Sequence, residues 1–305
     1  MSFEKSIRED FSDIPVVFFL GGQGTRMEDL AYKHVVLSKQ WLPIGFDENN
    51  EPIPLFWRNF EILLELGFKE FYIIVNKNGE KVKKYFEKKL QKTNELINVI
   101  LTNKENIEKK PKLKGVNVFI FENDVEGTGD QTLALKNPIG NRMFLRINGD
   151  EYFGGEKEKI KHEFSAFLQY SLKQIKENGA INVFAFVKKK NSLGSIWEKL
   201  STGILGGEAE GRVVETEESI HVLTSLCMTS PEFFETLLLE RPHSIGPLDL
   251  SSPQFGKRLI ESKKVYGKVI NVEIFSNVNL PEDYYKLVSY LNKKEKLERI
   301  VDKIR

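Results

Sequence analysis

The sequence has little of what marks secreted, membrane or nucleic-acid-binding proteins. Its 305 residues include one cysteine, Cys227, which excludes an internal disulfide framework and fits a reducing cytoplasm. No apolar run approaches the ~20 residues of a membrane span, and the N-terminus has no signal-peptide core. The 45 Lys and Arg nearly balance the 44 Asp and Glu, so no net field attracts nucleic acid or an acidic membrane. These absences predict a cytoplasmic protein that binds neither nucleic acid nor membranes, and they leave open whether it forms homo-oligomers.

What the chain does have is an alternation of apolar, β-rich runs and helical patterns. In the first half we expect strands over 15–20, 71–75, 116–121 and 143–147, with helices over 55–66, 80–90 and 130–136. Strands that alternate with helices predict a parallel sheet covered on both faces. In the second half we expect a helix over 165–178, strands over 180–187, 203–205, 212–215, 222–228 and 268–275, and a final helix from 284.

This pattern predicts a single α/β domain over residues 15–305, preceded by an N-terminal extension over 1–14. The domain would be Rossmann-like, with three layers and a mixed, mostly parallel sheet.

One stretch carries the strongest chemical signal. Residues 16–27 read VVFFLGGQGTRM, and SKQWLPIG follows at 38–45. A strand that ends in glycines exposes backbone N–H groups that a phosphate chain can approach, and Arg26 and Lys39 would add positive charge. The string is not a P-loop, and Met27 stands where a dinucleotide fingerprint needs its third glycine. Taken alone, this motif leaves a plain strand-to-loop turn equally open.

Other segments, in order along the chain, change that balance. GGQGTRM with SKQWLPI resembles the signature of the sugar-1-phosphate nucleotidylyltransferases, of the glucose-1-phosphate thymidylyltransferase and mannose-1-phosphate guanylyltransferase type. EGTGD at 126–130, FLRINGD at 144–150, GRVVE at 211–215, SPE at 230–232 and LPEDY at 280–284 are similar to further segments of that family. The resemblance covers about residues 15–290.

The resemblance implies the reaction NTP + sugar 1-phosphate → NDP-sugar + pyrophosphate, with Mg²⁺ as cofactor. It implies that Arg26 holds the β- and γ-phosphates, that Lys39 lies at the α-phosphate, and that Asp150 binds Mg²⁺ together with Asn277. The expected nucleotide-binding residues are Leu20, Gly21, Gly22, Gly24, Thr25, Glu122 and Gly127, and the expected acceptor-binding residues are Gly203, Glu218 and Ser225.

Three departures from the family concern the metal and the acceptor. Asn277 stands where the family has a second metal-binding aspartate, although an amide oxygen can also bind Mg²⁺. Glu218-Ser219-Ile220 lacks the lysine that contacts the sugar phosphate, and Ser225-Leu226-Cys227 replaces a Gly-Ile-Tyr segment. The nucleotide half of the signature is therefore kept better than the acceptor half.

Several alternatives stay open at this stage. The acceptor could be another phosphorylated alcohol, and the chain could be a regulatory subunit that binds NTP or NDP-sugar without turnover. SKQWLPI favours dTTP or UTP, whereas a carboxylate at Glu122 would suit guanine. A nicotinamide dehydrogenase fits poorly because of Met27 and the Lys39 segment.

Overall fold

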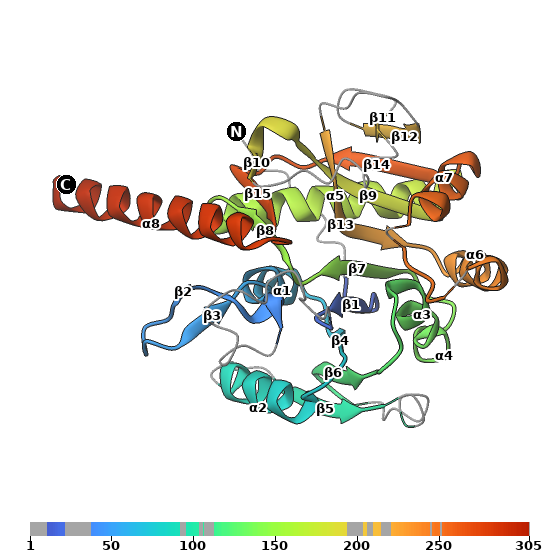
Figure 1. The fold of residues 1–305 in the computed structure, drawn as a ribbon, viewed down its shortest axis with the longest axis horizontal. Helices are drawn as coiled ribbons and strands as arrows, with labels where there is room; N and C mark the ends of the chain where they lie inside the picture. The colour runs from blue at the N-terminus through green and yellow to red at the C-terminus, as the bar shows by residue number, and fades with distance from the viewer. Residues whose placement is uncertain are drawn as a thin grey trace, which may run out of the picture.

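Strand β1 (Val16–Phe19) lies in the middle of the fold, between and parallel to β4 (Glu70–Val75) and β7 (Phe144–Asn148). All four residues of β1 are buried, because the sheet is covered on both faces (Figure 1). The computed structural model describes residues 11–21, 38–91, 96–103, 106, 113–193, 204–205, 210–214, 221–244, 246–250 and 252–304.

The central sheet has ten strands in the order β11-β12-β14-β9-β13-β7-β1-β4-β6-β5. The five strands from β7 to β5 are parallel to one another, whereas β13 runs antiparallel to both of its neighbours. The expected α/β domain with a mixed, mostly parallel sheet is thus confirmed. The remaining strands are β5 (Ile97–Thr102), β6 (Val116–Glu122), β9 (Asn182–Lys188), β11 (Ile204–Leu205), β12 (Glu210–Val214), β13 (His221–Thr229) and β14 (Val265–Val269).

The alternation of side chains along β1 divides the apolar interior into two layers. Val16 and Phe18 belong to the core on one face, and Val17 and Phe19 to the core on the other. The first layer is covered by α1 (Trp57–Glu65), α2 (Gly79–Leu90) and α5 (Lys157–Asn178). The second is covered by α3 (Thr128–Leu133), α4 (Lys136–Ile139), α6 (Glu232–Glu240) and α7 (Pro253–Glu261).

A small second sheet stands beside the large one. Its strands are β10 (Ser192–Leu193), β15 (Ile274–Asn277) and β8 (Glu151–Gly154), and a separate hairpin joins β2 (Pro43–Phe46) to β3 (Pro52–Pro54). The last helix, α8 (Pro281–Ile304), starts against this region and then extends away from the body (Figure 1). No described helix is long and apolar enough to cross a membrane.

Most elements expected from the sequence are present, with some corrections. The single strand expected over 268–275 is wrong, because the chain leaves β14 at Val269 and enters the small sheet only at Ile274. Strands β2, β3, β5 and β8 and helix α7 had no prediction. Phe11 and Ile14, within the expected extension, are buried against the main core, and Phe11 stacks on Phe68.

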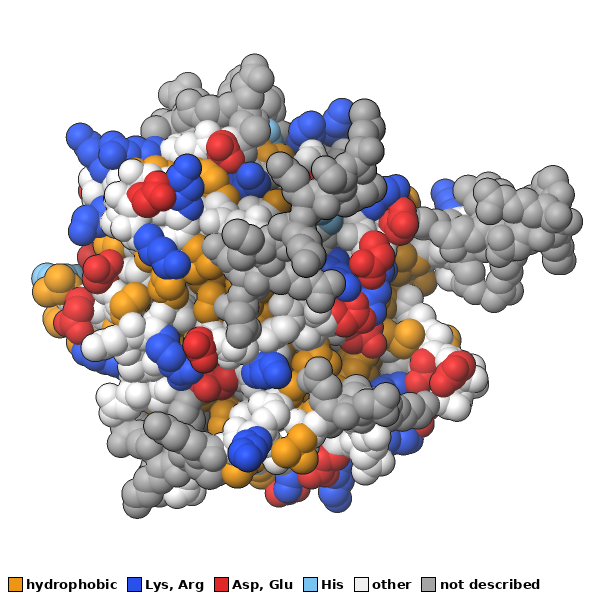
Figure 2. Space-filling view, turned by 180° about the vertical axis from the view of Figure 1, so that it is seen from behind, with side chains coloured by type: hydrophobic (Ala, Val, Ile, Leu, Met, Phe, Trp, Pro, Cys, Tyr) orange, Lys and Arg blue, Asp and Glu red, His pale blue; other side chains and the backbone are white. Residues whose placement is uncertain are grey.

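The face of the molecule shown in Figure 2 carries charges of both signs. Figure 2 shows Lys and Arg side chains interspersed with Asp and Glu over the face seen from behind, which agrees with the near-zero net charge.

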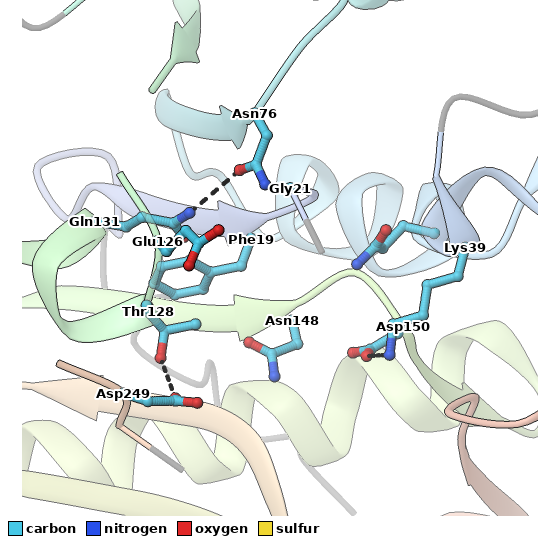
Figure 3. A pocket seen from close by; sticks show the side chains of 12 residues that line it. Phe19, Gly21, Lys39, Asn76, Glu126, Thr128, Gln131, Asn148, Asp150 and Asp249 are labelled. Carbon is cyan, nitrogen blue, oxygen red and sulfur yellow. Dashed lines mark hydrogen bonds and ion pairs between the residues drawn. The ribbon is translucent and has the colours of Figure 1, made fainter. Parts of the chain in front are cut away.

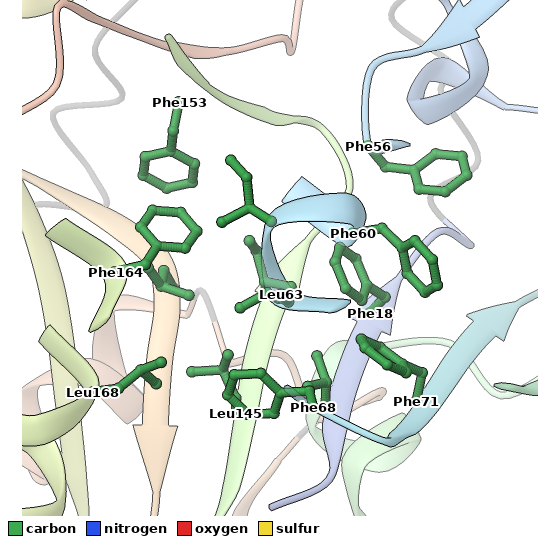
Figure 4. Packing of buried hydrophobic residues seen from close by; sticks show 14 of the residues in the cluster. Phe18, Phe56, Phe60, Leu63, Phe68, Phe71, Leu145, Phe153, Phe164 and Leu168 are labelled. Atoms are coloured by element: carbon green, nitrogen blue, oxygen red, sulfur yellow. The ribbon is translucent and has the colours of Figure 1, made fainter. Parts of the chain in front are cut away.

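Phenylalanines make up much of the core between α1 and the sheet. Phe60 is fully buried and contacts the rings of Phe18, Phe71 and Phe86 at centroid distances of 6.1, 4.7 and 5.1 Å (Figure 4). These contacts attach α1 to β1, to β4 and to α2.

Replacement of Phe60 by alanine is expected to lower the free energy of unfolding by about 3–5 kcal/mol, because it leaves a cavity in this core. Urea denaturation followed by circular dichroism measures the change. The control is Phe46→Ala, at a side chain that is 64% exposed, where the expected change stays within ~0.5 kcal/mol. Equal losses in the two variants would contradict this view of the core.

Candidate functional site

The parallel strands end at one edge of the sheet, and polar residues gather there. Gly21 follows β1, Asn76 follows β4, and Asp150 follows β7. Open α/β sheets bind ligands at the carboxyl ends of their strands, where the strand order changes direction, and β1 lies at such a point. These residues enclose a cavity of about 370 Å³ (Figure 3). Its lining residues are Phe19, Gly21, Lys39, Gln40, Asn76, Glu126, Gly127, Thr128, Gln131, Asn148, Asp150 and Asp249.

At one end of this cavity the backbone comes very close to a side-chain amide. A Cβ atom on Gly21 would lie 2.3 Å from Oδ1 of Asn76, so a larger residue would have to displace the Asn76 side chain. Oδ1 of Asn76 also accepts a hydrogen bond from Nε2 of Gln131 at 3.3 Å. Two side-chain amides, each able to donate and accept, therefore face the cavity beside the turn after β1.

The loop that precedes α3 forms a second wall and is held by the segment around Leu248. Gly127 has φ +84°, and a Cβ atom there would lie 2.6 Å from the carbonyl oxygen of Leu248. Thr128 donates to Asp249, and Asp130 accepts from the backbone N–H of Leu248. The EGTGD segment thus owes its shape to a part of the chain about 120 residues away.

The charged centre of the cavity is an ion pair between Lys39 and Asp150, with 2.5 Å between Nζ and Oδ2 (Figure 3). Lys39 begins a short 3-10 turn that ends at Trp41, whose ring packs edge-on against Phe56 and Tyr85. This aromatic anchor fixes the backbone from which the lysine reaches the cavity. Both charged side chains are nearly buried, with 13% and 11% exposed.

The small sheet supports the same pair from the other side. The carbonyl oxygen of Asp150 accepts a hydrogen bond from Val278, and Nζ of Lys39 donates to Oδ1 of Asn279 at 2.8 Å. Nδ2 of Asn279 in turn donates to Oδ1 of Asn277. The Asn-Val-Asn segment thus joins the final strand to the charged centre.

A second cavity of about 250 Å³ adjoins the first, and Phe19, Thr128, Asn148 and Asp249 line both. Glu151 is one of its walls and is buried, with both carboxyl oxygens accepting from the backbone N–H of Ser225. The Ser225 hydroxyl donates to Glu151 and accepts from the N–H of Asn148, so it clamps two strands together. Burial raises the pKa of the Glu151 carboxyl to about 8, which limits the negative charge beside Asp150.

Asp150 and Asn277 fit Mg²⁺ by their chemistry. Oδ1 of Asp150 is buried and accepts no hydrogen bond, which leaves one carboxylate oxygen unpaired beside the cavity. The described residues contain no cluster of three or more His, Cys, Asp or Glu side chains that could hold a metal. Magnesium needs only one or two carboxylates when phosphates and water complete its shell, so this sparse oxygen set matches it.

Known structures share this architecture, although no protein-family model and no curated protein sequence matches the chain. A UDP-glucose pyrophosphorylase without ligand superposes with a TM-score of 0.61 at 19% identity, over 92% of this chain and 99% of that one. The same coverage and TM-score hold for a UDP-glucose pyrophosphorylase in complex with UDP-glucose, at 17% identity. A protein of Bacillus anthracis with the provisional name glucose-1-phosphate thymidylyltransferase, in complex with sucrose, superposes with a TM-score of 0.62 at 13% identity, over 91% and 95% of the two chains.

The chain has the fold of the sugar nucleotidyltransferases. The likeness seen in the ordered sequence segments is therefore borne out at the level of the fold.

Within this nucleotidyltransferase fold, the expected site residues fall into three groups. Gly21, Lys39, Gly127 and Asp150 come together around the first cavity, and Ser225 and Asn277 line the second. Leu20 and Glu122 line neither cavity. Leu20 is buried and packs closely against Gly149, and Glu122 packs closely against Gly79 at the start of α2. The roles given to all of them stay predictions. Arg26, Gly22, Gly24, Thr25, Gly203 and Glu218 lie outside the described residues.

Sequence reasoning missed several residues that line the cavities. Asn76 and Gln131 carry no motif of their own, although Asn76 follows an apolar run that was expected to be a strand. Asp249 belongs to a loop that had no assignment. Glu151 stands next to the expected metal residue, but nothing in the sequence indicates that its side chain is buried.

The single cysteine lies in the wall behind the second cavity. Cys227 is fully buried on β13, and its Sγ donates to Oδ1 of Asn182 at 3.4 Å. Burial raises the pKa of its thiol, although the nearby Arg146 acts in the opposite direction. The thiol is therefore neutral and inaccessible in the native protein, as the apolar segment around it predicted.

A thiol-reactive dye such as DTNB is expected to label no cysteine in the native protein and one per chain in guanidinium chloride, because only the exposed thiolate reacts. The absorbance of the released thiolate gives the count. Fast labelling of the native protein would show that Cys227 is accessible.

Proposed function

We propose that this protein is a Mg²⁺-dependent nucleotidyltransferase that transfers a nucleotidyl group from an NTP to a sugar 1-phosphate. The observation that carries the proposal is the Lys39–Asp150 pair, placed where two adjoining cavities meet the carboxyl ends of the parallel strands. The larger cavity suits a nucleotide and the smaller one a single sugar ring.

The reaction needs two polyanions held in line. An oxygen of the sugar phosphate attacks the α-phosphorus of the NTP, the bond between that phosphorus and the bridging oxygen breaks, and pyrophosphate leaves. Little covalent chemistry falls to the protein, so positioning and charge stabilisation supply the catalysis.

The residues of the first cavity divide this work. Lys39 would place a compact positive charge beside the α-phosphate, once the nucleotide competes with Asp150 for its ammonium group. Gly21 and Gly127 would let the backbone approach the nucleotide, while Asn76 and Gln131 offer amide donors and acceptors for the base. Asp150 and Asn277 would hold Mg²⁺, which neutralises phosphate charge when bound.

The nucleotide and the acceptor can be tested together by pyrophosphate release. The protein is incubated with ATP, GTP, CTP, UTP or dTTP, each with glucose 1-phosphate or mannose 1-phosphate in the presence of MgCl₂. At least one pair is expected to release pyrophosphate, and EDTA is expected to abolish the release. Binding of nucleotides without release for any pair would favour a regulatory subunit instead.

Substitution of Lys39 or Asp150 by alanine is expected to lower turnover by ~10²-fold or more, because each change removes a charge beside the reacting phosphate. The matched control is Lys157→Ala, at a lysine that pairs with Glu65 on the surface, and this variant should keep its turnover. Normal rates in both site variants would show that these residues do not carry the chemistry.

A further inference from the structure

An arginine is buried in the wall of the second cavity. Arg146 lies in the middle of β7, pairs in register with Cys227 of β13, and is only 6% exposed. It lines the second cavity and not the first. Asp150 and Lys39, in contrast, line only the first cavity, so the guanidinium and the charged centre belong to different ends of the combined site.

Among the described residues, the groups that contact this guanidinium are neutral. Nε donates to Oγ1 of Thr229 at 2.9 Å, and Nη2 donates to Oδ1 of Asn182 at 3.1 Å and to Sγ of Cys227 at 3.4 Å. The guanidinium carbon lies 4.5 Å from the centre of the Phe233 ring. Nη1 donates no hydrogen bond to any described residue, although it belongs to a residue that is nine-tenths buried.

No carboxylate within the described part of the chain forms an ion pair with Arg146. Two carboxylates line the same cavity, but Glu151 accepts from Ser225 and Asp249 accepts from Thr128. Burial lowers the pKa of Arg146, yet a guanidinium starts so high that it stays charged. The second cavity therefore contains a largely buried positive charge that forms no ion pair with a described carboxylate.

Such a charge is costly for the unliganded protein. A buried ion without a partner loses its hydration, and an apolar side chain of similar volume is often equally stable or more stable. Removal of Arg146 would leave Thr229 and Cys227 with a partner, because both also donate to Oδ1 of Asn182. The hydrogen bonds and the Phe233 ring hold the guanidinium in place, but these groups carry no negative charge, whereas an incoming anion would.

We propose that the acceptor carries a carboxylate in addition to its phosphate, and that Arg146 binds this carboxylate. This inference rests on the proposed function. The phosphate of the acceptor must reach the Lys39–Asp150 end, so the anion at Arg146 is a second group on the same molecule. A single free nitrogen, Nη1, suits a singly charged carboxylate better than a second phosphate.

The test compares two sugar phosphates that differ only in whether the sugar carries a carboxylate. Binding of glucuronic acid 1-phosphate and of glucose 1-phosphate is measured by calorimetry, with and without Mg²⁺ and the α,β-methylene analogues of UTP, dTTP and GTP. The acid is expected to bind about 10- to 100-fold more tightly, as one charge-assisted hydrogen bond typically gives. Equal binding, weaker binding of the acid, or no binding of either compound in every series would overturn the inference.

Two variants assign the preference to Arg146. In Arg146→Met the preference for the acid is expected to disappear, while the binding of glucose 1-phosphate and the melting temperature stay the same or rise. The matched control is Arg142→Met, because Arg142 stands four residues earlier and pairs with Glu70 outside the cavity. It should keep the full preference.

A purely structural role for Arg146 would give a different result. Arg146→Met would then lower the melting temperature and weaken the binding of both compounds to the same extent. This outcome would overturn the inference. If Arg146→Met does not fold, Arg146→Lys is the second variant. It keeps the positive charge but lacks the planar guanidinium with its several donors, so it should retain part of the preference for the acid.

Pyrophosphate release separates this inference from the proposed function. Turnover of glucose 1-phosphate without any preference for the acid would overturn the inference and leave the nucleotidyltransferase reaction standing. Absence of turnover with every nucleotide and both acceptors would overturn the proposed function, and the calorimetric preference would then decide the inference by itself.

Discussion

The ion pair between Lys39 and Asp150 is the interaction on which the arrangement of the site depends. It joins a turn that follows β1 to the end of β7, and the Asn-Val-Asn segment after β15 holds it from the small sheet. Two nearly buried charges need each other, because either one alone would lose its hydration without compensation. The pair therefore constrains three distant segments at once in the wall of the first cavity.

The two cavities differ in how they are built. The first is bounded by glycines and amides that leave room for a ligand and offer backbone and side-chain hydrogen bonds. The second contains ionisable groups in unusual surroundings, with a carboxyl group at Glu151 whose pKa burial raises and a guanidinium at Arg146 that pairs with no carboxylate in the described part of the chain. Perturbed charges in a cleft are typical of sites that recognise a substrate, and the second cavity has this character.

Much of the fold followed from periodicity, but some elements did not. The parallel strands β1, β4, β6 and β7 are buried on both faces, so they appear in the sequence as continuous apolar runs. The edge strand β5 and the short strand β8 lack that signature. The stretch from 268 to 275 looks like one strand because Val and Ile recur along it, whereas the chain passes there from one sheet to another.

By itself, the sequence determined the order of strands and helices and the motif residues at strand ends, because hydrophobic periods and glycine turns are local properties. It thereby indicated Gly21, Lys39, Gly127 and Asp150 before any geometry was known. Only the tertiary structure placed Asn76 against Gly21, buried Glu151 under Ser225, and put Arg146 in the wall of the second cavity with neutral hydrogen-bond partners among the described residues. The reason is physical: burial, charge compensation and close approach depend on segments that are distant along the chain, and no local pattern records which of them meet.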